Sequence, residues 1–160
     1  MPPAIPGSML VETVFQYRTL IGKCDLGCGL DWEEIDHVGR IEHAFASDRH
    51  DGRRFRRSPV FLDAVIRGDQ INDAVEVMEL GPGGLVIAGA PFIARGEQIE
   101  IVIEDAEYSY RFRAQGKWLK DEGEDYRVGL QFIGMPVRLH KVALRQHETD
   151  IVDRMIERAA

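Results

Sequence analysis

The sequence predicts a mainly β fold: a six-stranded antiparallel β-barrel with an N-terminal helical hairpin and a C-terminal helix. Two observations predict it. After Pro59, apolar residues alternate with polar ones in several segments, as in half-buried strands, whereas on either side of this region they recur at helical spacing. Turn residues separate six such segments, and closing six strands into a barrel removes exposed strand edges.

Composition and patterning divide the chain into four parts. Residues 1–8 are rich in proline and glycine and form a flexible tail, and residues 9–47 form a helical extension. Residues 48–58 are an arginine-rich connector, and residues 59–160 are the barrel with its C-terminal helix. A chain of 160 residues has room for one such domain with extensions.

The segment 9–47 predicts two helices. Asp31 is a suitable N-cap for the second helix, and Glu34 follows three residues later, as a capping box requires. A short hairpin cannot bury both apolar faces alone, so we expect it to dock on the barrel or on a second copy of itself. The predicted apolar faces are Leu10, Val14, Tyr17 and Ile21 in the first helix, and Trp32, Ile35, Val38, Ile41 and Phe45 in the second.

The fifth strand candidate has the clearest alternation. Tyr108, Tyr110, Phe112, Ala114 and Trp118 face one way, while the intervening polar residues face the other. The aromatic row is either core or a stacking platform for nucleobases, and strand alternation favours core. The six candidates cover residues 60–67, 70–79, 84–89, 97–104, 107–119 and 126–134.

The last strand is expected to end at Met135-Pro136, and a C-terminal helix to begin at about Leu139. Its apolar stripe packs over one end of the barrel, or else joins the terminal helices of two copies in a homo-oligomer. The stripe comprises Leu144, Ile151, Val152, Met155, Ile156 and Ala159.

Charge and hydropathy exclude several classes of function. A formal net charge of −7 argues against binding to DNA or RNA, which normally needs a broad basic face. The N-terminus lacks the features of a signal peptide, and the longest apolar stretch, residues 84–94, is too short and too rich in glycine and proline to insert into a membrane. We therefore expect a cytoplasmic protein.

Neither a metal site nor a catalytic site is expected. Cys24 and Cys28 are the two cysteines of the chain, and no second pair of cysteines is present to complete a four-ligand zinc site. Glu34 and His37 resemble half of a helical metal motif, but no matching carboxylates follow on further helices. Nucleophile-elbow and Walker signatures are missing, so we predict a protein that is not an enzyme.

Four arginines, Arg53, Arg54, Arg56 and Arg57, fall within five residues just before the first strand. Such a cluster repels itself unless solvent or an anion screens it. A solvated loop, or pairing with the abundant acidic residues, would explain it without a ligand. Guanidinium groups also bind phosphate in a bidentate manner, stack on purines and donate to the O6/N7 edge of guanine.

These residues resemble motifs of the PilZ domain family. Arg53 and Arg57 fall on the two arginines of the RxxxR connector that precedes the barrel in that family. Residues 79–84 occupy the place of its second motif, D/N-x-S-x-x-G, and residues 127–132 resemble the GVxF-type pattern of its last strand. The resemblance covers residues 53 to about 145 and leaves the helical hairpin outside.

The resemblance implies a receptor for cyclic di-GMP, a bacterial second messenger, that changes conformation and signals to a protein partner. Arg53 and Arg57 would then contact phosphates and guanine edges, with Arg54 stacking or pairing beside them. The implied ligand-binding residues are Arg53, Arg54, Arg57, Glu79, Gly81 and Gly84. Ordering the connector would also move the helical hairpin relative to the barrel.

The second motif departs from the family pattern at two positions. Glu79 stands in place of Asp or Asn, and Gly81 stands in place of Ser, whereas Gly84 keeps the final glycine. A lost neutral hydrogen bond costs about 0.5–1.5 kcal/mol, roughly tenfold in affinity at most. The alternative is a degenerate PilZ domain that acts as a protein-interaction module without binding a nucleotide.

Overall fold

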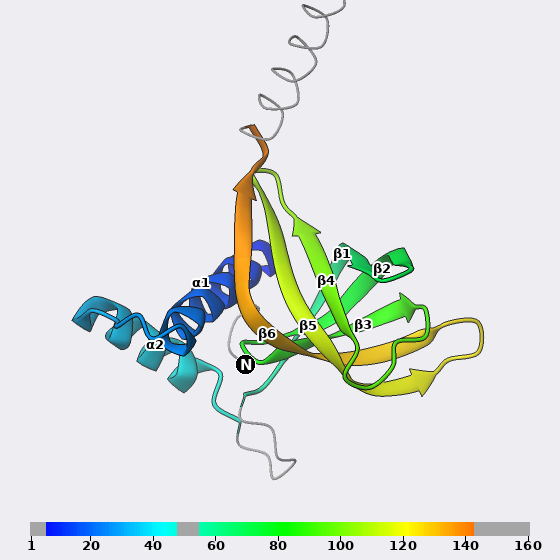
Figure 1. Cartoon of the computed structure of the whole chain (residues 1–160), viewed down its shortest axis with the longest axis horizontal. Helices are drawn as coiled ribbons and strands as arrows, with labels where there is room; N and C mark the ends of the chain where they lie inside the picture. Colours follow the sequence, from blue (N-terminus) through cyan, green and yellow to red (C-terminus); the bar gives the residue numbers. More distant parts are fainter. Residues whose placement is uncertain (1–5, 48–54, 143–160) are drawn as a thin grey trace, which may run out of the picture.

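The computed structural model describes residues 6–47 and 55–142 (Figure 1). Two helices precede six strands in the chain. The helices are α1 (Gly7–Asp25) and α2 (Trp32–Ala44). The strands are β1 (Ser58–Gly68), β2 (Ile71–Leu80), β3 (Gly84–Ala90), β4 (Gln98–Glu104), β5 (Tyr108–Asp121) and β6 (Tyr126–His140).

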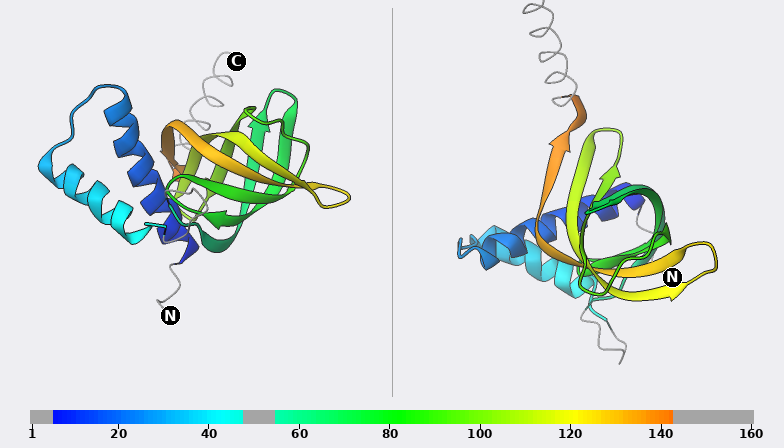
Figure 2. Two further views of the ribbon diagram at one scale, coloured as in Figure 1. Left: turned by 90° about the horizontal axis from the view of Figure 1, so that it is seen from below. Right: turned by 45° about the vertical axis from the view of Figure 1, so that its right-hand side comes forward.

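The six strands form one antiparallel sheet in the order β1-β2-β3-β6-β5-β4. Strand β1 pairs with β2 along most of its length and with β4 over residues 65–67, which closes the sheet into a barrel (Figure 2, right). The predicted mainly β fold with six antiparallel strands is confirmed. The first five strands begin and end within two residues of their predicted bounds.

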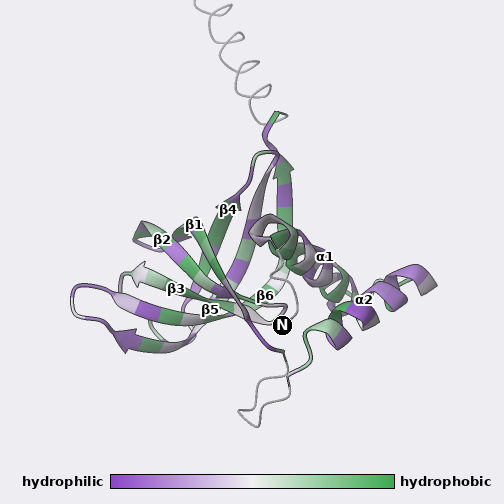
Figure 3. Ribbon diagram, turned by 180° about the vertical axis from the view of Figure 1, so that it is seen from behind, coloured by the Kyte–Doolittle hydropathy of each residue, from purple (hydrophilic) through white to green (hydrophobic). Residues whose placement is uncertain are grey.

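One hydrophobic core fills the barrel and continues under α1. Hydrophobic and polar residues alternate along the strands (Figure 3), so each strand turns an apolar face inward. Helix α1 adds its own apolar face to the same cluster instead of forming a separate one. The fully buried side chains include Leu10, Val14, Ile66, Val77, Leu85, Ile87, Ile101, Phe112 and Leu130.

Strand β6 is longer than predicted. It passes Met135-Pro136 and reaches His140, so the expected strand end at these residues is wrong. Helical residues follow at Lys141 and Val142, two residues after the expected start at about Leu139, and the rest of the expected helix is not described. Residues 134–136 form a bulge in the pairing with β5, where Gly134 has a φ of +64°. A bulge residue needs no ladder hydrogen bond, which is why proline is tolerated there. The predicted C-terminal apolar stripe, residues 144–159, lies outside the described residues.

The helical hairpin is confirmed, with one correction. Asp31 caps α2, and Glu34 completes the capping box. Ile41 and Phe45 are buried, but Trp32 and Ile35 are exposed by 85% and 47%, so their place on the buried face was wrong. The two helices diverge toward the loop that joins them (Figure 2, left), which leaves the start of α2 without a packing surface.

Candidate ligand-binding site

A cleft of about 570 Å³ lies where α1 meets the barrel. Its walls come from α1, the connector before β1, the β2–β3 turn, and the middle of β5 and β6. Its volume is in the range of sites that hold small molecules and cofactors. The lining residues are Tyr17, Arg18, Ile21, Phe55, Arg57, Gly83, Gly84, Lys117, Trp118, Gln131 and Phe132.

The last two arginines of the connector have different surroundings: Arg56 contacts α2, and Arg57 lines the cleft. The Arg56 backbone N–H donates to the Phe45 carbonyl at 2.9 Å, and its guanidinium Nη2 donates to the Ala44 carbonyl at 2.7 Å, at the C-terminus of α2. Neighbouring side chains of an extended chain point to opposite sides. Arg57 accordingly lines the cleft, with its Nη2 3.1 Å from the point where a Cβ on Gly84 would stand.

The β2–β3 turn lies directly against this connector. The Gly81 N–H donates to the Gly84 carbonyl at 3.0 Å, which closes the hairpin turn between β2 and β3. A Cβ on Gly81 would stand 2.6 Å from the Arg56 carbonyl oxygen, and one on Gly84 would overlap the Leu130 carbonyl oxygen. Both glycines are therefore required by close backbone approach, and Gly81 leaves no room for the serine of the family motif.

Trp118 forms an aromatic wall of the cleft instead of joining the core. Its predicted place on the inward face of the fifth strand is wrong, because β5 has a bulge between Gly116 and Trp118 that changes the direction of the side chain. The side chain is 38% exposed, and its indole covers Gly129 on β6 so closely that any Cβ there would overlap it. The glycine thus gives the indole a flat surface to lie on.

The cleft is cationic. Arg18, Arg57 and Lys117 line it, and its lining includes no aspartate or glutamate among the residues that the structure describes. This contrasts with the net charge of −7 for the whole chain. A concave surface with one sign of charge attracts ligands of the opposite sign.

Arg18 reaches the cleft from α1. Its Nη2 donates to the Gly134 carbonyl at 3.3 Å, while its Nε is buried and has no hydrogen-bond partner within residues 6–47 and 55–142. No carboxylate in that part of the chain forms an ion pair with it. Burial in this position lowers the pKa of the Arg18 guanidinium below its ordinary value.

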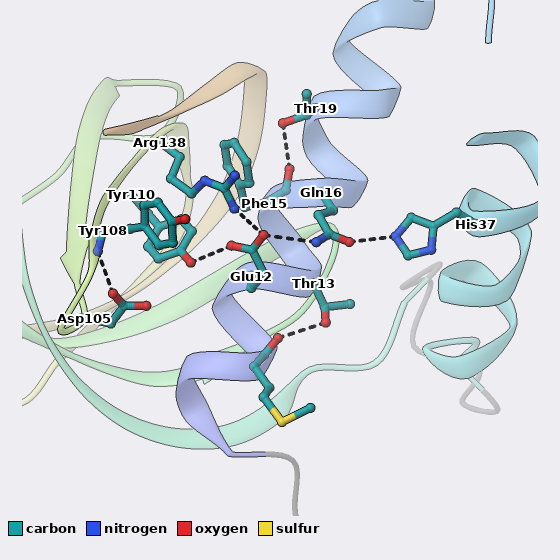
Figure 4. A network of polar contacts seen from close by, with 11 residues as sticks. Glu12, Thr13, Phe15, Gln16, Thr19, His37, Asp105, Tyr108, Tyr110 and Arg138 are labelled. Carbon is teal, nitrogen blue, oxygen red and sulfur yellow. Dashed lines mark hydrogen bonds and ion pairs between the residues drawn. The ribbon is translucent and has the colours of Figure 1, made fainter. Parts of the chain in front are cut away.

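A second polar cluster, here called the Glu12 network, joins α1 to β5 and β6 (Figure 4). The Glu12 carboxylate pairs with Arg138 and accepts hydrogen bonds from the Tyr110 hydroxyl at 2.5 Å and from Gln16 Nε2 at 3.0 Å. Gln16 Oε1 in turn lies 2.8 Å from His37 Nε2 on α2. The network therefore connects both helices to the barrel.

Charges in the Glu12 network are matched. Burial alone raises the pKa of Glu12, but the hydrogen bonds from Arg138, Tyr110 and Gln16 outweigh burial and bring the pKa below its ordinary value of 4.5. The hydrogen bond to Glu12 raises the pKa of Arg138, and burial followed by the same carboxylate raises that of Tyr110. Each group holds its partner in the protonation state that the pair needs.

The structure brings together only some of the residues predicted from sequence. Arg57 and Gly84 line the cleft, and Gly81 touches the connector. Glu79 lies on β2 opposite Pro59, half-buried, and is not one of the lining residues. The remaining two predicted residues, Arg53 and Arg54, lie outside the described residues.

Sequence reasoning missed nine of the eleven lining residues, and three of these, Arg18, Lys117 and Trp118, matter most for the charge and the aromatic surface of the cleft. Lys117 had a signal, because the strand alternation placed it on the outward face beside the arginines of β5. Trp118 was assigned to the core, since nothing in the local sequence marks the bulge before it. Arg18 had no signal, because a helical arginine acquires its surroundings only when the helix docks.

Residues weighed for metal binding have other contacts. Glu34 caps α2 and pairs with Lys23 at 2.7 Å, and His37 contacts Gln16. Cys24 and Cys28 are exposed free thiols. The described part of the chain contains no group of three or more His, Cys, Asp or Glu residues able to hold a metal ion. Neither of its helices has the length and apolar character needed to cross a membrane.

Comparison with known families identifies the PilZ domain. The PilZ domain model matches residues 51–147, more than half of the chain. This segment contains all six strands and the connector arginine that reaches the cleft, whereas α1 and α2 lie before it. No curated protein matches the chain.

Proposed function

Because the chain belongs to the PilZ domain family, a family of cyclic di-GMP receptors, we propose that it binds cyclic di-GMP in the cleft between α1 and the barrel and transmits this binding to a partner. PilZ domains are binding modules and not enzymes. The protein in this proposal is therefore a receptor whose output is a change of conformation.

The position of Arg57 carries the proposal. Its guanidinium lies against Gly84, so the first family motif and the last glycine of the second motif meet at one wall of the cleft. The ligand carries two phosphate charges, and guanidinium groups bind phosphate through paired, charge-assisted hydrogen bonds. The cationic lining supports this assignment, since Arg18 and Lys117 add to the attraction that Arg57 exerts on an anion.

Trp118 supports binding of a nucleotide over that of a simple anion. A half-exposed indole in a cationic cleft offers a face on which a guanine can stack, an interaction worth about 1–3 kcal/mol per base. We assign phosphate and guanine contacts to Arg53, Arg54 and Arg57, and close backbone approach to Gly81 and Gly84. Glu79 is assigned to the guanine N–H groups, as the family motif implies.

The connector offers a route for the output. Arg56 binds the C-terminal carbonyl of α2, and its neighbour Arg57 lines the cleft. A ligand that draws Arg57 inward therefore also acts on the attachment of α2. In this proposal the helical hairpin changes its position on the barrel when the ligand binds.

One set of observations favours the alternative, a PilZ domain that binds a protein and no nucleotide. Glu79 is not among the residues that line the cleft, and Gly81 has no space for the serine hydroxyl of the family motif. Both departures affect the half of the site that reads guanine.

Calorimetric titration with cyclic di-GMP, with GTP as the comparison ligand, distinguishes the two functions. We expect binding at micromolar concentration or tighter in the native protein and its loss in Arg57→Ala. Arg67→Ala is the matched control, because Arg67 is an exposed arginine on β1 that does not line the cleft and pairs with Glu100 at 3.9 Å. Binding that Arg57→Ala leaves intact, or no binding by the native protein, contradicts the proposal, and the second result supports the alternative.

A further inference from the structure

We infer that Arg18 on α1 is a phosphate-binding residue of the same cleft, so that the ligand joins the helical extension to the barrel. This inference rests on the proposed function. It goes beyond the family motifs, because α1 ends at Asp25 and the matched segment begins at residue 51. The ligand class is a phosphodiester dinucleotide held by cations from two separate parts of the chain.

The surroundings of Arg18 are those of an anion-binding group. The Asp25 carboxylate attracts Arg18 at longer range. No carboxylate among the described residues forms an ion pair with it, so this partly buried guanidinium loses hydration without gaining a paired contact. Among the described residues, its one hydrogen bond is the 3.3 Å contact with the neutral Gly134 carbonyl, and its Nε has no acceptor. A phosphate oxygen would supply both the missing acceptor and the missing charge.

The rest of α1 holds Arg18 in place. Gly22 packs so closely on Met135 of the β6 bulge that a Cβ would stand 3.0 Å from that side chain. Toward the N-terminus, the Glu12 network attaches the helix to β5 and β6. Arg18 lies between these two contacts, so its position over the cleft does not depend on a ligand.

A ligand held by Arg18 and Arg57 would connect α1 to the connector. Lys117 and Trp118 close the opposite wall from β5. The bound state would then hold α1 more firmly on the barrel than the free state does. A partner that contacts the helical hairpin would distinguish the bound state from the free state by this difference.

Arg18→Met is the test variant, because methionine keeps the apolar stem and the helix propensity and removes only the charged head. Arg40→Met is its matched control. Arg40 is also helical, but it is exposed on α2 and pairs with Asp36. Both variants, Arg57→Ala and the native protein are titrated with cyclic di-GMP, and hydrogen exchange of the α1 amides is measured with and without ligand.

We expect Arg18→Met to weaken binding about tenfold or more, since it removes a charge-assisted contact. Ligand should slow amide exchange in α1 of the native protein and of Arg40→Met, and much less in Arg18→Met. Unfolding in urea should show Arg18→Met to be as stable as the native protein or more so, which separates ligand contact from structural damage.

Failure of the inference can be told from failure of the proposed function. If Arg57→Ala loses binding while Arg18→Met binds within about twofold of the native protein, Arg18 is not a ligand contact and the receptor function stands. If the native protein does not bind cyclic di-GMP, both are wrong. A loss of affinity in Arg40→Met equal to that in Arg18→Met would also overturn the inference, because it would show an effect of charge alone.

Discussion

Helix α1 meets the barrel through two polar contacts of opposite character. At Glu12, a carboxylate has an arginine, a phenol and an amide as partners. At Arg18, a partly buried guanidinium has one neutral carbonyl as its hydrogen-bond partner within the described residues. Both contacts join α1 to β6, and they are six residues, or about 9 Å of helix, apart.

The difference teaches where the molecule uses its charges for stability and where it keeps them for a ligand. A matched buried pair holds elements together, and removing one partner leaves the other charge buried and costly. An unmatched buried cation contributes little to folding and is retained where it has another use. The Glu12 network is therefore interpreted as the attachment of α1, and the cleft around Arg18 as the site that α1 serves.

The largest expected effect is on stability, at the matched contact. Glu12→Ala leaves Arg138 without its carboxylate and Tyr110 without its acceptor, at side chains that are about two-thirds buried or more. We expect the free energy of unfolding to fall by about 2–3 kcal/mol, measured by urea denaturation. Affinity for cyclic di-GMP, corrected for the unfolded fraction, should change far less than in Arg18→Met.

Asp36→Ala is the control for this change, because it removes the same charge from an exposed pair with Arg40. Its effect on the free energy of unfolding should stay within about 0.5 kcal/mol. An equal loss in both variants would mean that the Glu12 network does not hold the helix, and the comparison between the two contacts would be lost.

The next effect concerns the space between the turn and the connector. In Gly81→Ala, the new methyl group would stand 2.6 Å from the Arg56 carbonyl oxygen, so the connector must shift. We expect a loss of about 1–3 kcal/mol in the free energy of unfolding and weaker binding of the ligand, because Arg57 moves with the connector. Thermal unfolding and calorimetric titration measure the two effects.

Gly83→Ala lies in the same turn and serves as the matched control. Its Cβ would meet only Phe55, at an ordinary 3.6 Å. If Gly81→Ala is as well tolerated as Gly83→Ala, the close approach of turn and connector is not required for the site.

A smaller effect is expected from Trp118 on the far wall of the cleft. Trp118→Ala should weaken binding about tenfold through lost stacking and change stability little, because the indole is already partly exposed. The chain has two tryptophans, and the other, Trp32, is exposed on α2. In Trp32→Phe, all tryptophan fluorescence comes from Trp118, and cyclic di-GMP should quench it.

Trp118→Phe is the control for the fluorescence experiment. In Trp118→Phe, the remaining signal comes from Trp32 at the exposed start of α2. Quenching that survives in this variant and disappears in Trp32→Phe would place the base away from β5.

The sequence was sufficient for those parts of the fold that local physics determines. Alternating residues located the first five strands, and the side chain of Asp31 with that of Glu34 located the start of α2. The errors on the sheet both occur at bulges, at Trp118 and at residues 134–136. The bulge before Trp118 changes the direction of that side chain, and nothing in the local sequence marks it. The bulge at residues 134–136 contains a glycine and a proline, which are typical of a strand end as well.

The candidate site was predicted only as far as its motifs extend along the chain. Arg57 and Gly84 were identified because each belongs to a short pattern, and the structure places them in contact across the wall of the cleft. Arg18 could not be identified, since its significance comes from docking against β6 more than a hundred residues away. Long-range packing of this kind leaves no mark on a local pattern of residues.

The smallest effect separates the two contacts by pH. The folded pKa of Glu12 is below its ordinary 4.5, so its stabilising contribution is complete above about pH 4.5 and is lost as the pH falls through the folded value. We expect the difference in free energy of unfolding between the native protein and Glu12→Gln to be constant from about pH 7 to about pH 5 and to narrow only below 4.5. Subtracting the free energy of unfolding of the variant from that of the native protein cancels the contributions of the other carboxylates.

The corresponding difference for Arg18→Met should stay constant over the same range, because an arginine does not titrate there. A difference that instead grows as the pH falls towards 4.5 would mean that burial outweighs the hydrogen bonds and raises the folded pKa of Glu12. A pH-dependent difference at Arg18 would mean that a carboxylate is paired with it after all.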